Sequence, residues 1–164
     1  MDTAFKLLAA ALFFIERHSI RYVSNEQNKA IALRYAKELG DFFQTGDLSF
    51  VDRLFTKDAK LHMPGLPTNV DTRQLFSALR PAMPDFQTRI EDIVAEGDKV
   101  ALRITWSGTH KGELMGIPAT GKHVEVTEMQ FYRIQDGKIA ERWVEADMLG
   151  MLQQMGLVPA TGSR

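Results

Sequence analysis

Residues 100–107 alternate strictly between large apolar side chains and small or polar ones, and this alternation limits the folds open to the chain. A period of two residues is typical of a strand with one buried face. That face would carry Val100, Leu102, Ile104 and Trp106. Two more strands are predicted over residues 123–134 and 138–147, and the Asp-Gly pair at their junction favours a tight hairpin. The second half of the chain therefore predicts a sheet.

The first half of the chain has the helical period instead. A helix is expected to begin at the capping box Ser24-Asn25-Glu26-Gln27 and to end at Gly46-Asp47. Further elements are predicted over 49–55 (helix), 59–63 (strand), from the N-cap Asp71 to Pro81 and Pro84 (helix), and near 149–155 (helix). Helices followed by strands are typical of the α+β class. We predict N-terminal helices packed on a strongly curved, mixed or antiparallel sheet that encloses an apolar pocket.

The chain has 164 residues, of which 45% are hydrophobic, and this fits one domain with one core. We place that domain over residues 24–158, followed by a polar tail over 159–164. Residues 1–23 form an apolar extension, whose run Leu7–Ile15 is too short to span a membrane. We interpret the extension as an extra helix docked on the domain or on a second subunit. The less favoured alternative is an export signal, which Asp2 and the lack of a small-residue cleavage site argue against.

The composition excludes several classes of function. The net charge is −1 with scattered Lys and Arg, so we expect no nucleic-acid partner. The absence of cysteine excludes disulfides and thiolate chemistry, and it favours the cytoplasm. The four histidines lack the spacing of metal ligands, and no phosphate-binding or dinucleotide-binding motif occurs. We therefore expect no metal, and phosphate and nicotinamide chemistry lack support. We also expect no membrane partner.

Two polar residues interrupt the apolar face of the strand predicted over 123–134. Glu128 and Gln130 have the parity of the apolar residues there. A buried carboxylate or amide is costly unless it is paired or wetted. Either both side chains point into a pocket, or a β-bulge turns them to solvent, or Arg133 or Arg142 closes a network around them.

The last strand and one earlier strand supply the other candidates. Trp143 could form an apolar wall, with Glu145 and Asp147 on the same parity, and a desolvated carboxylate suits acid–base chemistry. Asp147 could instead cap the helix that begins at Met148, and Glu145 could be a plain surface residue. His62 could reach the pocket mouth as a proton donor or acceptor, or be structural.

Several segments resemble the SnoaL-like polyketide cyclase (ester cyclase) family. They are Leu61-His62-Met63-Pro64-Gly65, Glu96-Gly97-Asp98-Lys99-Val100, Gly108-Thr109-His110-Lys111-Gly112, Gly116-Ile117-Pro118-Ala119-Thr120-Gly121-Lys122 and the run from Tyr132 to Trp143. The resemblance runs from about residue 27 to residue 155. It implies an NTF2-like cone. It also implies that, in the cyclases proper, an acidic residue on the late strands moves a proton during aldol closure of a polyketide methyl ester, without a cofactor.

The chain departs from the family at one motif. Many relatives look like Glu-His-Trp-Asp where this chain has Glu141-Arg142-Trp143-Val144, so a histidine and an acid are replaced. If that acid is the one the cyclases use, Glu145 or Asp147 would have to take over.

We predict a cofactor-independent enzyme of the cyclase, isomerase or dehydratase type. It would use carboxylate acid–base catalysis on a small apolar carbonyl compound. The catalytic candidates are Asp147, Glu128, Glu145 and His62, and the substrate-binding candidates are Gln130, Trp143, Trp106, Tyr35 and Phe42. The alternative is a non-catalytic small-molecule-binding module with the same cone. We expect a homodimer that pairs through the outer face of the sheet or through the N-terminal extension.

Overall fold

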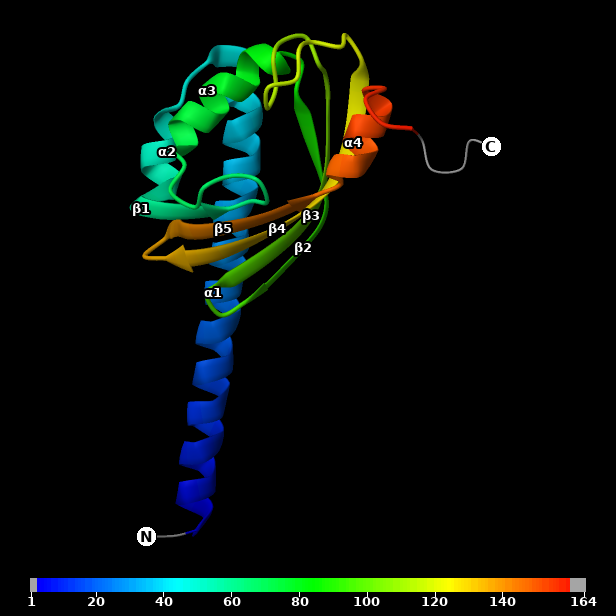
Figure 1. Cartoon of the computed structure of the whole chain (residues 1–164). Coiled ribbons are helices and arrows are strands. Elements are labelled where there is room, and N and C mark those ends of the chain that lie inside the picture. Colours follow the sequence, from blue (N-terminus) through cyan, green and yellow to red (C-terminus); the bar gives the residue numbers. More distant parts are fainter. Residues whose placement is uncertain (1–2, 160–164) are drawn as a thin grey trace.

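The computed structural model describes the backbone of residues 3–159 and the side chains of residues 24–159. In this part of the chain, helices come before most of the strands, which confirms the predicted α+β class (Figure 1). The elements are α1 (Thr3–Thr45), α2 (Ser49–Leu54), β1 (Phe55–His62), α3 (Thr72–Ala82), β2 (Gln87–Glu96), β3 (Lys99–Thr109), β4 (His123–Gln135), β5 (Lys138–Ala146) and α4 (Met148–Gln154).

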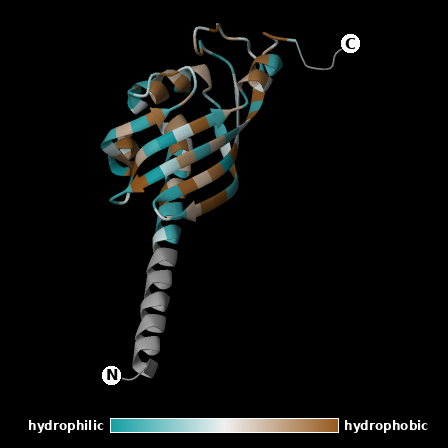
Figure 2. Ribbon diagram, turned by 60° about the horizontal axis from the view of Figure 1, so that its bottom comes forward, coloured by the Kyte–Doolittle hydropathy of each residue, from teal (hydrophilic) through white to brown (hydrophobic). Residues whose placement is uncertain are grey.

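The strands form one curved, mixed sheet in the order β1-β5-β4-β3-β2. β1 runs parallel to β5, and the other neighbours are antiparallel. Every second residue of β4 is buried from Val124 to Ile134, and Figure 2 shows the matching alternation of apolar and polar residues along the strands. We call the face that carries these buried residues the inner face, because all four helices contribute side chains to the core that lies against it.

A β-bulge at Ala140 changes the alternation of β5. Ile134 pairs with Ile139, but the preceding residue of β4, Arg133, pairs with Glu141, which leaves Ala140 as an extra residue. Beyond the bulge, the even-numbered residues of β5 face inward. Strict alternation from the start of this strand would put the odd-numbered residues inward, so that expectation from the sequence is wrong.

Helix α1 does not begin at the predicted capping box. It is continuous from Thr3 through Ser24 to Thr45, so the predicted start is wrong. Residues 4–12 are rich in Ala and Leu, which are good helix formers, and no Gly or Pro lies between them and Ser24, so the helix continues through the Ser instead of starting there. The predicted end is confirmed, because Gly46 adopts a φ of 80° and its amide donates to the Phe42 carbonyl (2.7 Å).

The segment of α1 before Ser24 leads away from the sheet (Figure 1). The side chains of residues 1–23, on which the predicted docking of the extension depends, lie outside the described part of the chain. Residues 160–164, most of the predicted polar tail, lie outside it too. Within the described part, no helix has the length and the apolar character needed to cross a membrane.

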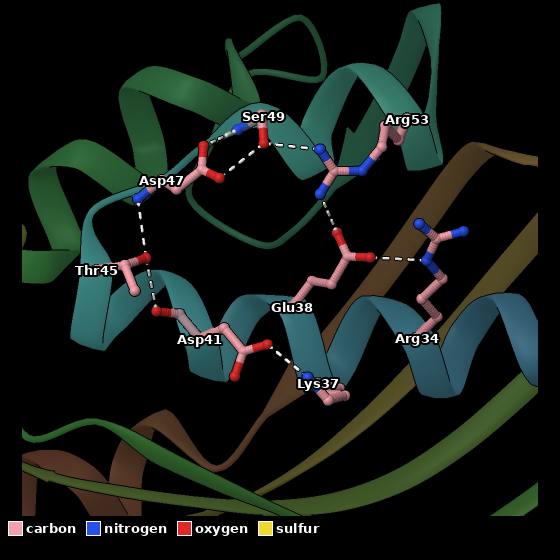
Figure 3. A network of polar contacts seen from close by, with 8 residues as sticks. All are labelled: Arg34, Lys37, Glu38, Asp41, Thr45, Asp47, Ser49 and Arg53. Atoms are coloured by element: carbon pink, nitrogen blue, oxygen red, sulfur yellow. Dashed lines mark hydrogen bonds and ion pairs between the residues drawn. The ribbon is translucent and has the colours of Figure 1, made fainter.

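A polar network joins the end of α1 to α2 (Figure 3). Glu38 pairs with Arg34 (2.7 Å) and with Arg53 of α2 (2.7 Å). Arg53 also donates to the Ser49 hydroxyl (2.7 Å), and the Asp47 carboxylate accepts from the amide and the hydroxyl of Ser49 (both 2.8 Å). These two bonds lower the pKa of Asp47. The network fixes the turn that sets α2 against the core.

The other predicted helices are present. Asp71 caps α3 and accepts from the amides of Arg73 (2.7 Å) and Gln74 (3.3 Å), as its sequence context predicts. The helix ends at Ala82, one residue beyond Pro81. The strand expected over 59–63 is longer than predicted, because β1 already begins at residue 55 and pairs with β5. Together α3, α4 and the inner face of the sheet surround the candidate site.

Candidate active site

An apolar cavity of about 140 Å³ lies between the inner face of the sheet, α3 and α4. A dry cavity of roughly 150 Å³ in another protein accepts benzene, so this space suits a single ring. Its apolar wall includes Leu61, Leu75, Leu79, Ile104, Val144 and Met151. A wider groove of about 620 Å³ lies beside β1, but it is open and lined largely by charged and polar residues. The smaller cavity combines an apolar wall with a few buried polar groups, as ligand sites do.

Glu128 and Gln130 project from β4 into this cavity. Their exposed fractions are 7% and 5%, so the proposed turn toward solvent is wrong. The indole nitrogen of Trp106 donates to one Glu128 oxygen (2.9 Å), and the Gln130 amide donates to the other. The Tyr132 hydroxyl donates in turn to the Gln130 carbonyl oxygen. The result is a chain of hydrogen bonds along the inner face of β4 that ends at a carboxylate.

Arg142 closes this network from β5, as one alternative from the sequence had proposed. Its Nη2 lies 3.6 Å from a Glu128 oxygen, and its side chain is 11% exposed. The guanidinium sits 5.3 Å above the ring of Tyr35. Its Nε is buried and has no hydrogen-bond partner among the residues that the structure describes. Arg133, the other candidate for this role, instead holds Glu141 through two hydrogen bonds (2.9 and 2.8 Å).

The core beneath the cavity strongly disfavours ionised tyrosines. Burial raises the pKa of Tyr35 to about 12, although the nearby Arg142 charge opposes the shift. Burial also raises the pKa of Tyr132 well above its usual value, again against Arg142. For Arg142, burial favours the neutral form, but the two tyrosines and Glu128 outweigh it and the pKa rises. Arg142 therefore places a permanent positive charge in the lining of the cavity.

Two predicted site residues lie on the other face of the sheet. Trp143 stacks on His62, with 4.9 Å between ring centroids and 7° between planes, and it meets Phe131 edge-on. His62 Nε2 lies 3.2 Å from a Glu141 oxygen. The bulge at Ala140 turns Trp143 to this face, and His62 lies beside it because the two residues pair across β1 and β5. The predictions that Trp143 walls the pocket and that His62 reaches its mouth are therefore wrong.

The remaining candidates are also outside the cavity lining. Glu145 is exposed and pairs in register with the exposed Met129. The Asp147 carboxylate accepts from the Gly150 amide (2.8 Å) and caps α4, as the structural alternative proposed. Tyr35 and Phe42 belong to the aromatic core beneath the site. The structure thus brings together three predicted residues, Trp106, Glu128 and Gln130, and it adds Arg142.

Sequence reasoning missed Arg142 as a cavity residue. It shares its parity with Val144 and Ala146, which also line the cavity, but that parity becomes the inward one only because of the bulge. In the described part of the chain, no group of three or more His, Asp or Glu side chains could hold a metal ion.

The comparisons with known proteins identify the chain's relatives. The family model "SnoaL-like polyketide cyclase" matches residues 33–155. Aklanonic acid methyl ester cyclase DnrD of Streptomyces peucetius is 35% identical over 72 residues, which cover 43% of this chain and 50% of DnrD. The chain thus spans about half the length of the curated relatives it matches.

Solved structures are similar to this chain over more of its length. AclR from Streptomyces galilaeus is 31% identical with a TM-score of 0.70, covering 85% of this chain and 87% of AclR. IdmH from Streptomyces antibioticus is 35% identical with a TM-score of 0.60, covering 72% of this chain and 93% of IdmH. Helices on a curved mixed sheet around a cavity are the NTF2-like architecture of these neighbours. The chain therefore belongs to the SnoaL-like polyketide cyclase family.

Proposed function

We propose that the protein is a cyclase-type enzyme in which Glu128 moves a proton on a small apolar carbonyl compound. One observation carries this proposal: among the described residues that line the apolar cavity, Glu128 is the only carboxylic acid. A positioned carboxylate in a dry site is a general base suited to removing a proton beside a carbonyl group. Trp106 and Gln130 hold the carboxylate in one orientation.

The reaction would proceed in two steps. The Glu128 carboxylate takes a proton from the carbon beside a carbonyl, and the electron pair of the broken C–H bond moves onto the carbonyl oxygen as an enolate. The enolate carbon then forms a bond to a second carbonyl carbon of the same molecule, and the new alkoxide takes the proton back from Glu128. The proton count is unchanged, and the sum is an aldol closure.

The position of Glu128 fits the departure from the family motif. Position 144, where the motif Glu-His-Trp-Asp of the resemblance has an acid, carries the buried Val144, which faces the cavity. Gln130 pairs with Val144 across the strands, and Glu128 lies two residues along the same face. We propose that the acid has moved from β5 to β4, so neither Glu145 nor Asp147 is needed for catalysis.

The substrate class follows from the cavity and from the relatives. The name of DnrD specifies aklanonic acid methyl ester, and we propose a related carbonyl compound here that is smaller or only partly inserted in the cavity. Met63, Leu66, Leu114 and Met115 line the rim, and Met115 is exposed. Methionine side chains adapt their shape readily, so the rim could widen around a ligand that is longer than one ring.

A proton-exchange experiment tests the role of Glu128. The wild-type protein should speed the exchange of deuterium from D₂O into the carbons beside the carbonyl of cyclohexanone, followed by NMR. Glu128→Gln should lower this catalysed exchange by at least about 100-fold, the usual range for loss of a general base. Glu145→Gln and Asp147→Asn are matched controls and should keep it. Full activity in Glu128→Gln, with an unchanged melting curve, would rule the proposal out.

A binding module without catalysis is the second candidate. One observation supports this second candidate: both oxygens of Glu128 already accept hydrogen bonds from within the protein. The same experiment separates the two functions. If cyclohexanone binds, as measured by calorimetry, but exchanges no faster than in buffer, the binding function replaces the enzymatic one.

A further inference from the structure

We propose that Arg142 binds an anionic oxygen of the ligand, so that the cavity selects carbonyl compounds that readily form an enolate. This role of Arg142 rests on the proposed function, because it assigns the group that receives the negative charge when Glu128 takes the proton. It goes further in naming the recognition residue and the acidity of the preferred substrate. Arg142 stands where the motif Glu-His-Trp-Asp of the resemblance has a histidine, so this role is specific to the present chain.

The position of Arg142 supports this role. Its side chain lines the cavity and is 11% exposed, so few water molecules compete for its donors. The buried Nε has no hydrogen-bond partner among the described residues. A guanidinium carries five N–H donors and stays charged, and an unfilled buried donor is costly. A ligand oxygen would remove that cost.

The contact between Arg142 and Glu128 is too loose to account for the arginine by itself. Their nearest atoms are 3.6 Å apart, whereas on the outer face Arg133 holds Glu141 through two bonds of 2.9 and 2.8 Å. Bidentate geometry is the strong form of this pair, and Arg142 does not adopt it. The tyrosine ring beneath the guanidinium stabilises it from the other side. Arg142 also shares a side-chain hydrogen bond with Tyr132, so it is fixed in place, and its buried Nε is the donor left without a partner among the described residues.

Charge balance through the reaction gives the reason for such a residue. Before the proton moves, the negative charge of Glu128 offsets Arg142. Once Glu128 is protonated, the negative charge lies on the enolate oxygen, and Arg142 is the single positive residue among the described cavity-lining side chains. A preorganised positive charge at the site where negative charge develops is a large source of rate enhancement in a dry cavity. Ligands that carry that charge stably should therefore bind well.

A chromogenic phenol tests this directly, because its phenolate mimics an enolate on one ring. The probe is 4-nitrophenol, whose phenolate absorbs visible light and whose neutral form does not. Wild-type protein should bind it as the phenolate, with the phenolic proton passing to Glu128 as the substrate proton would, and should shift its apparent ionisation by about one pH unit toward acid, a tenfold preference. The neutral isostere 4-nitroanisole should bind about tenfold more weakly or worse.

Variants separate recognition from folding. Arg142→Met should abolish the spectral shift, Arg142→Lys should keep part of it, and Arg133→Gln, which lies on the outer face, should leave it unchanged. Glu128→Gln should strengthen phenolate binding, because it removes the neighbouring negative charge; a merely structural arginine would not produce this gain. The double variant Glu128→Gln/Arg142→Met removes both charges together and guards against misfolding caused by one unpaired charge.

Three results would overturn the role of Arg142: a bound spectrum of the neutral phenol, equal affinity for 4-nitroanisole, or no binding of either probe by the wild type. The wild-type spectrum decides the question even if the variants unfold. If only the proposed function is wrong, the protein still binds the phenolate, but Glu128→Gln does not lower proton exchange. If only the role of Arg142 is wrong, the protein still catalyses proton exchange and still needs Glu128 for it, but it does not prefer the phenolate.

Discussion

Tyr35 is the residue around which the aromatic core is arranged. Its ring centroid lies 5.4–6.4 Å from four neighbouring aromatic rings, which are those of Phe50, Phe55, Phe76 and Tyr132. Its hydroxyl is buried and has no hydrogen-bond partner among the described residues. Tyr35 therefore contributes packing through its ring, while its hydroxyl is a cost to the folded state.

Tyr35→Phe should raise the free energy of unfolding at neutral pH by about 1 kcal/mol, because it removes an unsatisfied polar atom and keeps the ring. Denaturant unfolding measures the change. The control is Tyr132→Phe, which loses a hydroxyl that donates to Gln130 and should cost about 1 kcal/mol instead. Equal effects of the two variants would contradict the assignment of the unpaired hydroxyl.

The same Tyr35 variant should alter the alkaline part of the stability curve. Burial raises the pKa of Tyr35 to about 12 from 10.0, so between these values the unfolded chain loses the proton and the folded chain keeps it. Stability from this group is complete below pH 10.0 and is lost as the pH rises toward about 12. Wild-type stability should fall more steeply over this interval than that of Tyr35→Phe. Parallel curves would be inconsistent with the raised pKa.

At the scale of elements, period and capping signals predicted most of the architecture from the sequence. The alternation in β3 and β4 and the cap of α3 depend on local chemistry, which a sequence displays directly. The start of α1 and the inward face of β5 were wrong for different reasons. At Ser24 one local signal outweighs another, because the helix formers earlier in α1 override the capping pattern. Ala140 is an extra residue that only the pairing of β4 with β5 reveals, and this nonlocal choice leaves no local signal.

The candidate site shows the same limit. Glu128, Gln130 and Trp106 were identified because polar groups on an apolar face are conspicuous. Arg142 was named only as one possible partner of these polar groups and Val144 was not named as a site residue, since the direction of both side chains depends on the bulge. Arg142 and Val144 line the cavity, whereas Trp143 between them lies on the outer face.

Helix α4 offers a prediction at the scale of one element. Asp147 caps it, and Met148 and Met151 of this helix line the cavity. Asp147→Ala should cost about 1 kcal/mol of stability and weaken probe binding, because the first turn of α4 loses its acceptor. Asp147→Asn should keep both, since asparagine caps equally well. Thermal melts and calorimetry measure the two effects. Loss of proton exchange in a stable Asp147→Asn would instead identify Asp147 as the acid.

At the scale of the whole molecule, the outer face of the sheet carries exposed apolar side chains. Met129 and Phe131 are exposed there, next to the stacked pair of His62 and Trp143. Exposed apolar clusters of this kind favour association. We keep the expectation of a homodimer and propose this face as its contact.

Sedimentation tests the expected homodimer by measuring how many chains associate. Wild-type protein should sediment as two chains, and Phe131→Arg should shift it toward one chain, because a charge would be buried in the contact. Leu33→Arg is the matched control, since Leu33 on α1 and Phe131 are both 43% exposed. A monomeric wild type, or a dimer that Leu33→Arg disrupts and Phe131→Arg does not, would exclude this contact.

The long helix α1 also has a practical consequence for handling the protein. The segment between Thr3 and Ser24 adds roughly 30 Å of helix, and it leaves the body at the end opposite α3 and α4, which border the cavity (Figure 1). A dye, affinity tag or sensor chip attached ahead of Thr3 would thus be separated from the cavity by a built-in spacer. Immobilisation by that end should leave the binding opening turned toward the bulk solution.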